Sequence, residues 1–172
     1  MSDSAFYSSV ATILPDSIKT KLRGQLDFSV TTSLTASSGD GWIYAEPSVT
    51  HTSADILGTT EDYIGPTTGA GAVATGDKLK WIVIKHTGTT NGKTSSGSGV
   101  MISLDGTTAT SSYKGIFLAP GEMIALKSPN ATVADLHAIT VNVLNGVPTA
   151  IATVSASDTV RLIVAGVLNN VG

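Results

Sequence analysis

The 172-residue chain contains no cysteine, so disulfide bonds and thiolate metal sites are excluded. A chain of this length can bury an adequate hydrophobic core without such cross-links. The absence does not identify a compartment, because secreted, cytosolic and virion proteins can all lack cysteine. The length suits one domain, or one domain with an arm.

Charged residues are also scarce: they make up 13% of the sequence, which is about half the usual share. The net charge of −3 provides no basic field that would attract nucleic acid or anionic lipid. We therefore expect no nucleic-acid partner and no membrane partner. A surface short of charge is poorly protected against association, and it is tolerated when an assembly or a partner covers it. The composition favours a protein that works in contact with other proteins.

Long apolar runs are missing as well. The longest run of the C-terminal third, residues 160–168, is interrupted by Arg161 and is too short to span a bilayer. Residues 1–7 have neither the basic region nor the apolar region of a secretory signal. We expect the protein to mature in the cytoplasm of the cell that makes it.

The residue patterns that catalysis requires are absent or lack their structural context. His51, His86 and His137 form none of the HxH, HxxxH or HExxH spacings of metal sites. Gly97-Ser98-Gly99 lies in a flexible linker, not on the strand-to-helix turn that carries a hydrolase nucleophile. Gly92-Lys93-Thr94 lacks the strand–loop–helix frame of a phosphate-binding loop. We expect no enzymatic activity and no cofactor.

Carboxylates are sparse, and only Glu61 and Asp62 are adjacent in the sequence. Neighbours on an extended chain point apart, so this pair suits a single site poorly. A calcium site built from Asp40, Asp55, Glu61 or Asp62 with loop carbonyls is the open alternative, because hard cations take oxygen ligands from loops. No EF-hand spacing supports this alternative, and we expect no bound metal.

Short strands separated by turn residues fill most of the sequence. Alternation, β-branched residues and aromatic residues predict strands at 26–30, 42–45, 49–56, 79–85, 100–104, 113–118, 123–126, 136–144, 148–154 and 160–168. Pro120-Gly121 predicts a type II turn between two of these strands. In the strand at 136–144 the pattern places Leu136 and Ala138 outwards, opposite Ile139 and Val141. The spacing indicates an all-β sandwich or barrel.

Residues 1–25 differ from the rest of the chain. Asp16 followed by residues 17–22 predicts one or two helical turns, which Gly24 ends. We expect an N-terminal arm or short helical segment over 1–25 and a β-sandwich domain over 26–172. The first segment either packs on the edge of the domain or reaches a neighbouring subunit.

The two tryptophans, Trp42 and Trp81, fall in predicted strands, where core packing is their expected role. The alternative is a sugar-stacking platform, as in a carbohydrate-binding or adhesin module. That alternative requires Trp42, Trp81 or Tyr63 to be exposed on one face.

One part of the chain resembles a known family. A strand at 81–88 leads to a Thr/Gly loop, the strand and turn at 100–106, the hairpin Leu118-Ala119-Pro120-Gly121-Glu122 and a final strand at 159–166. This order, over roughly residues 79–168, resembles small β-sandwich virion proteins of tailed bacteriophages, notably capsid decoration (cement) proteins. The resemblance implies a jelly-roll-like sandwich, often a homotrimer, that binds the major capsid protein and clips neighbouring capsid subunits together.

We therefore expect a non-enzymatic virion protein that is made in the host cytoplasm and stabilises the capsid surface. The alternatives are another virion component, such as a tail, neck or fibre-base protein, or a carbohydrate-binding or adhesin module. The candidate contact residues are aromatic and basic, namely Phe6, Tyr7, Lys19, Lys21, Arg23 and Tyr63.

Overall fold

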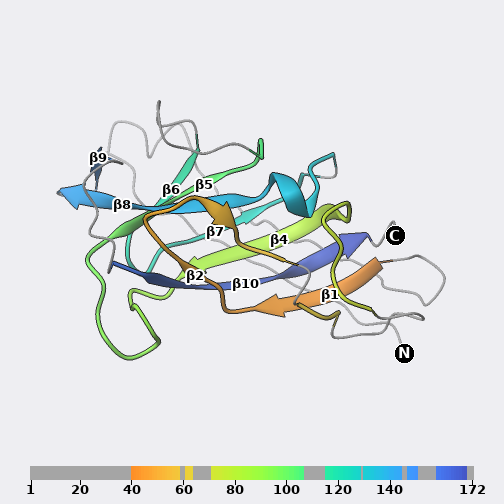
Figure 1. Cartoon of the computed structure of the whole chain (residues 1–172), viewed down its shortest axis with the longest axis horizontal. Coiled ribbons are helices and arrows are strands. Elements are labelled where there is room, and N and C mark those ends of the chain that lie inside the picture. Colours follow the sequence, from red (N-terminus) through yellow and green to blue (C-terminus); the bar gives the residue numbers. More distant parts are fainter. Residues whose placement is uncertain are drawn as a thin grey trace, which may run out of the picture. The chain divides into compact units, whose positions relative to one another are not determined.

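The computed structural model describes residues 40–58, 61–63, 71–106, 115–128, 130–144, 147–150 and 158–169, all within one compact unit, Ala36–Gly172. The predicted arm over 1–25, the strand at 26–30 and the boundary between the two predicted segments lie outside the described residues. The described residues form an all-β fold of two antiparallel sheets (Figure 1). Their single helical element is the 3-10 helix η1 (Val133–Asp135). None of the described helices is long and apolar enough to cross a membrane.

The first sheet has the strand order β1-β10-β4-β7. Its strands are β1 (Asp40–Ala45), β10 (Val160–Asn169), β4 (Lys78–His86) and β7 (Met123–Leu126), and the short β2 (Ser48–Val49) also pairs with β10. β10 lies between β1 and β4, so strands that are far apart in the sequence become neighbours (Figure 1). The β-branched and aromatic residues of β4 and β10 suit these central positions.

The second sheet has the strand order β3-β8-β5-β6. Its strands are β3 (Ala54–Asp55), β8 (His137–Leu144), β5 (Gly99–Ser103) and β6 (Ile116–Leu118). In addition, β9 (Val147–Ala150) pairs with the C-terminal part of β8, residues 142–144. All of these pairs are antiparallel.

The two sheets share one hydrophobic core cluster. Its members include Ile43, Ile82, Ile84, Leu162 and Val164 from the first sheet, and Val100, Ile102, Leu118 and Ala138 from the second. They occupy alternate positions on their strands, as expected when one face of each sheet is turned towards the other. Complete burial of one such side chain stabilises the fold by about 1.5–3 kcal/mol. The prediction of an all-β fold is confirmed.

Most predicted strands occur where the sequence places them, but two predictions are wrong. The predicted strand at 49–56 is two strands, β2 and β3, because the chain passes between them from the first sheet to the second. Leu136 and Ala138 belong to the shared core, whereas the larger Ile139 and Val141 lie on the opposite side of β8 in a separate apolar cluster. The sequence pattern separates the two faces correctly and assigns the core to the wrong one.

The turn between β6 and β7 has the predicted Pro-Gly chemistry. Gly121 has φ +86°, which L side chains rarely adopt and which position three of a type II turn requires. The Glu122 N–H donates to the Ala119 carbonyl oxygen at 3.0 Å, and the Glu122 side chain accepts the Ala119 N–H at 2.8 Å. Both bonds fix the entry into β7.

Candidate protein-contact face

The first sheet has an outer face made of the side chains that alternate with its core residues. It comprises Trp42 and Tyr44 of β1, Arg161, Ile163, Ala165 and Val167 of β10, Trp81, Val83 and Lys85 of β4, and Met123 and Ala125 of β7. None of these residues belongs to a hydrophobic core cluster. We refer to this set as the outer face of the first sheet.

Strand register aligns the outer face in rows. One row runs across all four strands through Tyr44, Ala165, Val83 and Ala125. A second row contains Trp42, Val167 and Trp81, and a third contains Ile163, Lys85 and Met123. Side chains directly opposite each other on neighbouring antiparallel strands lie within about 5.5 Å at Cβ. The outer face is therefore a continuous surface that is mostly apolar.

Exposure varies across this face. Val167, which lies in register between the two tryptophans, is buried, Trp81 is 8% exposed, and Trp42 is half-buried. Tyr44 is 47% exposed and Met123 is 50% exposed. Among the described residues these two are the exposed large hydrophobic side chains, and both lie on this face. An apolar surface with Trp, Tyr, Met and Arg has the composition typical of protein interfaces.

A β-bulge places Trp81 on the outer face. Val167 pairs with Trp81, but the next residue, Leu168, pairs with Leu79, so Lys80 is an extra residue on β4. The neighbouring Gly166 permits a very close approach of the two strands. A Cβ atom at Gly166 would lie 2.3 Å from the Trp81 carbonyl oxygen, a contact that real Cβ atoms do not make.

A polar network borders the outer face next to Tyr44. The Tyr44 hydroxyl donates to Oε1 of Glu46 at 2.6 Å. Arg161 forms an ion pair with Oε2 of Glu46 and donates from its Nη1 to the Asn91 carbonyl oxygen at 3.3 Å. The hydrogen bond to Glu46 raises the pKa of Tyr44, and the same bond, together with the charge of Arg161, lowers the pKa of Glu46. Glu46 is thus an ionised acceptor for both residues.

The loop after β4 is tied at its base to a buried histidine. Nδ1 of His86 accepts the Gly88 N–H at 2.9 Å, so Nε2 carries the ring proton and donates to the Ser98 carbonyl oxygen at 2.9 Å. Burial lowers the pKa of His86, which favours this neutral form. Both ring nitrogens are therefore engaged with the backbone at the two ends of the loop.

Ser98, His86 and Asp158 come together here, but their connections are not those of a catalytic triad. His86 contacts the carbonyl oxygen of Ser98, not its hydroxyl. The Ser98 hydroxyl instead faces the Asp158 carboxylate at 3.5 Å. A triad requires the histidine to accept the serine proton while the carboxylate orients the histidine. This geometry holds a loop and does not activate a nucleophile.

The carboxylates considered for a calcium site are dispersed. Asp55 pairs with Nε2 of His137 at 2.8 Å, and Glu61 accepts the Gly58 N–H at 2.7 Å. Within the described ranges no group of three or more His, Asp or Glu side chains is arranged to hold a metal ion.

Of the predicted contact residues, Phe6, Tyr7, Lys19, Lys21 and Arg23 lie outside the described residues.

Tyr63 is 5% exposed and belongs to the shared core. Its hydroxyl donates to Oδ2 of the buried Asp77 at 2.5 Å. This position does not suit a residue that contacts a partner. It also separates Tyr63 from Trp42 and Trp81, which lie on the outer face of the first sheet, so the three aromatic residues do not form one exposed platform.

Sequence reasoning missed Tyr44 and Met123. The available signal was the spacing of Trp42 and Tyr44, because aromatic residues two apart on a strand share a face. Trp81 is buried, as expected, and Trp42 is half-buried, but both lie on the outer side of the first sheet and belong to neither core cluster. Comparisons of the chain with protein-family models, with curated proteins and with solved structures found no match.

Proposed function

We propose that the chain is a non-enzymatic structural protein of a tailed-bacteriophage virion that decorates the capsid and stabilises it through contacts with the major capsid protein. The observation that carries the proposal is the outer face of the first sheet. Tyr44 and Met123, the exposed large hydrophobic side chains among the described residues, both lie there. The resemblance of residues 79–168 to capsid decoration proteins supports the same function.

The jelly-roll-like sandwich is part of this proposal. Two antiparallel sheets that share a core support it. The pairing of β2 and β3 with different sheets also supports it, because strands of a sandwich connect the two layers. On the virion surface the protein acts as a homotrimer, which the family resemblance implies and which the low charge of the chain favours.

Such a protein stabilises the shell by binding only the assembled state. Each bound copy adds contact area across the boundary between capsid subunits, and dissociation of the shell must first break those contacts. A ligand present at about 100 times its Kd stabilises the state that it binds by about 2.7 kcal/mol per site. This mechanism requires a surface of matching shape and no reactive group.

The test uses the purified full-length chain and undecorated capsids of the phage that encodes it. We expect saturable binding in a sedimentation assay and a higher melting temperature of the shell, with bovine serum albumin as the non-binding control. Binding without saturation and an unchanged melting temperature would sink the proposal. Cryo-electron microscopy of virions is expected to place the protein on the capsid, and density on the tail, neck or fibre base would contradict that location.

A further inference from the structure

The cations of the described residues are confined to one of the two sheets. The six described Lys and Arg residues lie in or next to the first sheet: Lys78, Lys80 and Lys85 in β4, Lys93 in the loop after β4, Lys127 directly after β7, and Arg161 in β10. The strands and the helix of the second sheet contain no Lys or Arg, and Asp55, Asp105 and Asp135 lie in or beside them. Carboxylates lie in or next to both sheets, so among Lys, Arg, Asp and Glu the second sheet has only acidic side chains and the first has both signs.

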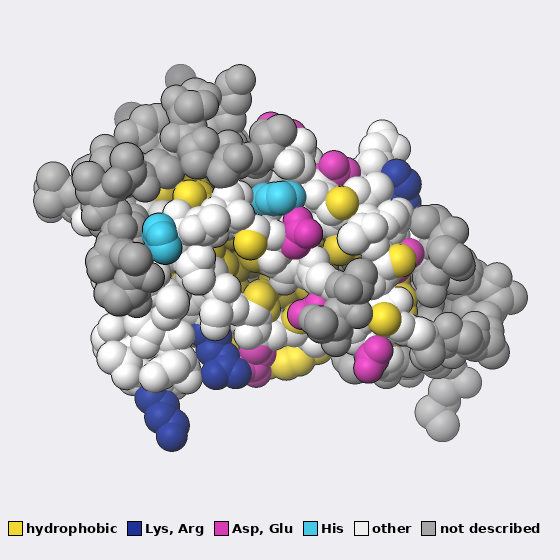
Figure 2. Space-filling model, in the orientation of Figure 1, with side chains coloured by type: hydrophobic (Ala, Val, Ile, Leu, Met, Phe, Trp, Pro, Cys, Tyr) yellow, Lys and Arg dark blue, Asp and Glu magenta, His cyan; other side chains and the backbone are white. Residues whose placement is uncertain are grey.

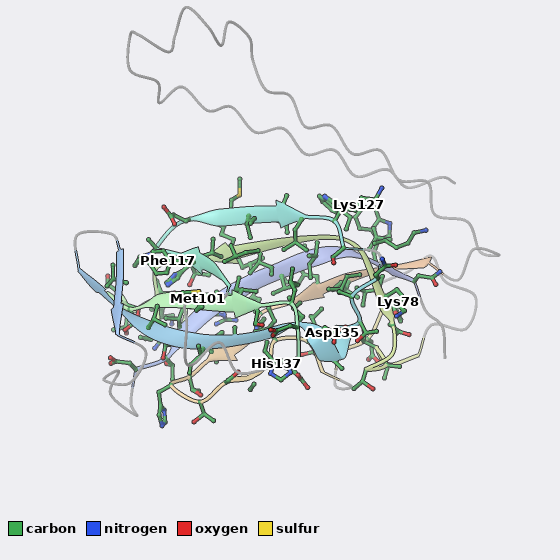
Figure 3. All side chains as sticks on the ribbon, turned by 90° about the horizontal axis from the view of Figure 1, so that it is seen from above. Lys78, Met101, Phe117, Lys127, Asp135 and His137 are labelled. Atoms are coloured by element: carbon green, nitrogen blue, oxygen red, sulfur yellow. The ribbon has the colours of Figure 1, made fainter. Side chains whose placement is uncertain are left out.

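Figures 2 and 3 show where charged and apolar side chains lie in two views of the described residues. On the side of the molecule seen in Figure 2, the described carboxylates are spread across the surface, and the Lys and Arg side chains lie at its margins. In Figure 3, Lys78 and Lys127 lie at the same end of the molecule, and Met101 and Phe117 of the second sheet lie together towards the other end.

The cations flank the apolar part of the outer face at both ends. Lys85 is exposed and lies in register between Ile163 and Met123, and Arg161 is on the same end of the sheet. The antiparallel pairing of β4 with β7 places Lys127 at the opposite end, close to the start of β4. The outer face thus has an apolar centre with cations at each end.

The described carboxylates next to this face already have partners. Glu46 accepts the Tyr44 hydroxyl and pairs with Arg161. Glu122 accepts the Ala119 N–H within its own turn. Lys85 and Lys127 are exposed cations, and the Glu46 and Glu122 carboxylates bind other groups.

We propose that the outer face of the first sheet docks on an acidic protein surface, in which carboxylates meet Lys85 and Lys127 around an apolar patch that receives Tyr44 and Met123. This inference rests on the proposed function and names the chemistry of the capsid-protein surface that the chain recognises. Complementary charge selects the partner and speeds association, whereas the aromatic and methionine side chains supply most of the affinity.

The same charges disfavour a second copy as the occupant. A two-fold contact places the same surface of both copies together. Because this face has cations at both ends, a two-fold contact centred on it would bring a cationic end of one copy near a cationic end of the other. Like charges in contact across an interface reject that partner.

The test measures the affinity of the full-length chain and its variants for undecorated capsids. We expect Tyr44→Ala to weaken binding about 30-fold, as truncation of an interface anchor does, and Lys85→Glu to weaken it about 10-fold. Asp62→Lys is the matched control, because it reverses the charge of an exposed residue that is not part of the defined outer face and should change affinity less than about 2-fold. Raising NaCl from about 0.05 to about 0.5 M should weaken the wild type more than Lys85→Glu. Circular dichroism and thermal melting verify that each variant is folded.

Each outcome separates the inference from the proposed function. Wild-type binding with unchanged affinity for both Tyr44→Ala and Lys85→Glu would overturn the docking inference and leave the capsid function standing. A gain for Asp62→Lys equal to the loss for Lys85→Glu would show that net charge alone sets the affinity, which also overturns the inference. Light scattering that shows dissociation of an oligomer by either face variant would assign the face to contacts between copies. Failure of the wild type to bind capsids removes the proposed function and the inference with it.

Discussion

The outer faces of the two sheets both contain apolar side chains, but the two faces differ in how far their large apolar side chains are exposed to solvent. On the second sheet, Met101, Ile139 and Val141 are buried and form a separate cluster with Phe117. Figure 3 shows Met101 beside Phe117, its register partner on β6. On the first sheet, Tyr44 and Met123 remain about half exposed.

An antiparallel sheet with one solvated face normally alternates apolar and polar residues along its strands. Neither sheet follows that pattern here, since β5 is buried along its whole length and β4 has Trp81 and Val83 on its outward side. The apolar residues of the second outer face are buried within the chain and stabilise its fold. On the first outer face Val167 and Trp81 are also buried, whereas Tyr44 and Met123 are about half accessible to solvent. Methionine is thus buried on the outer face of one sheet, at Met101, and exposed on that of the other, at Met123.

Two methionines test this difference most strongly. Met101→Ala removes a side chain that is 1% exposed, and we expect it to lower the free energy of unfolding by about 2–5 kcal/mol. Met123→Ala removes one that is 50% exposed, and the expected change is within about 0.5 kcal/mol. Chemical denaturation followed by tryptophan fluorescence measures both. Equal losses of unfolding free energy for the two variants would show that both methionines contribute equally to the stability of the fold, which would contradict the comparison.

Two glycines sharpen the comparison at the level of the backbone. A Cβ atom at Gly166 would meet the Trp81 carbonyl oxygen and the Ile82 Cα atom of the neighbouring strand, so Gly166→Ala should cost about 1–3 kcal/mol of stability. A Cβ atom at Gly99 in the second sheet would meet the side chains of Phe117 and Val143. These side chains can move, so Gly99→Ala is expected to cost less. Thermal unfolding of the two variants gives the order, and a larger loss for Gly99→Ala would contradict it.

The smallest expected effect concerns the polar border of the first outer face. Tyr44→Phe removes the hydroxyl that donates to Glu46, so the pKa of Glu46 should rise towards its usual value. The sign follows from linkage: the lowered pKa of Glu46 stabilises the fold above the pKa of the unfolded chain, and that stabilisation is lost as the pH falls through the folded pKa. NMR titration of the Glu46 carboxyl carbon measures the change. Arg161 still faces Glu46 in the variant, so the shift should be partial, and no shift at all would show that Tyr44 has no role in it.

The sequence predicts the fold class because strands such as β4 and β10 combine β-branched residues with clear turn residues at their ends. It fails at 49–56, where a weakly patterned stretch does not reveal that the chain changes sheet. It also fails to assign the faces of β8, because Ile139 and Val141 are larger and more apolar than Ala138 and still lie outside the shared core. Hydrophobicity alone cannot identify the inner face when both faces are apolar.

The outer face of the first sheet could not be predicted from the sequence, for a related reason. Tyr44, Ala165 and Val83 become neighbours only through the register of strands that are far apart in the chain. Tyr63 has the residue type of an interface anchor, and only the tertiary structure shows its bond to the buried Asp77. The confinement of the described lysines to one sheet likewise becomes visible only when each lysine is assigned to a strand.

The central position of β10 has a consequence for synthesis of the protein on the ribosome. β1 and β4 lie on either side of β10, and each pairs with it, so β10 joins these two strands into one sheet. The first sheet therefore cannot close until residue 169 has left the ribosomal exit tunnel, and pairings over such long sequence separations form slowly. A prematurely terminated chain would lack the strand that aligns Tyr44 with Val83. Truncated products consequently cannot form the outer face of the first sheet.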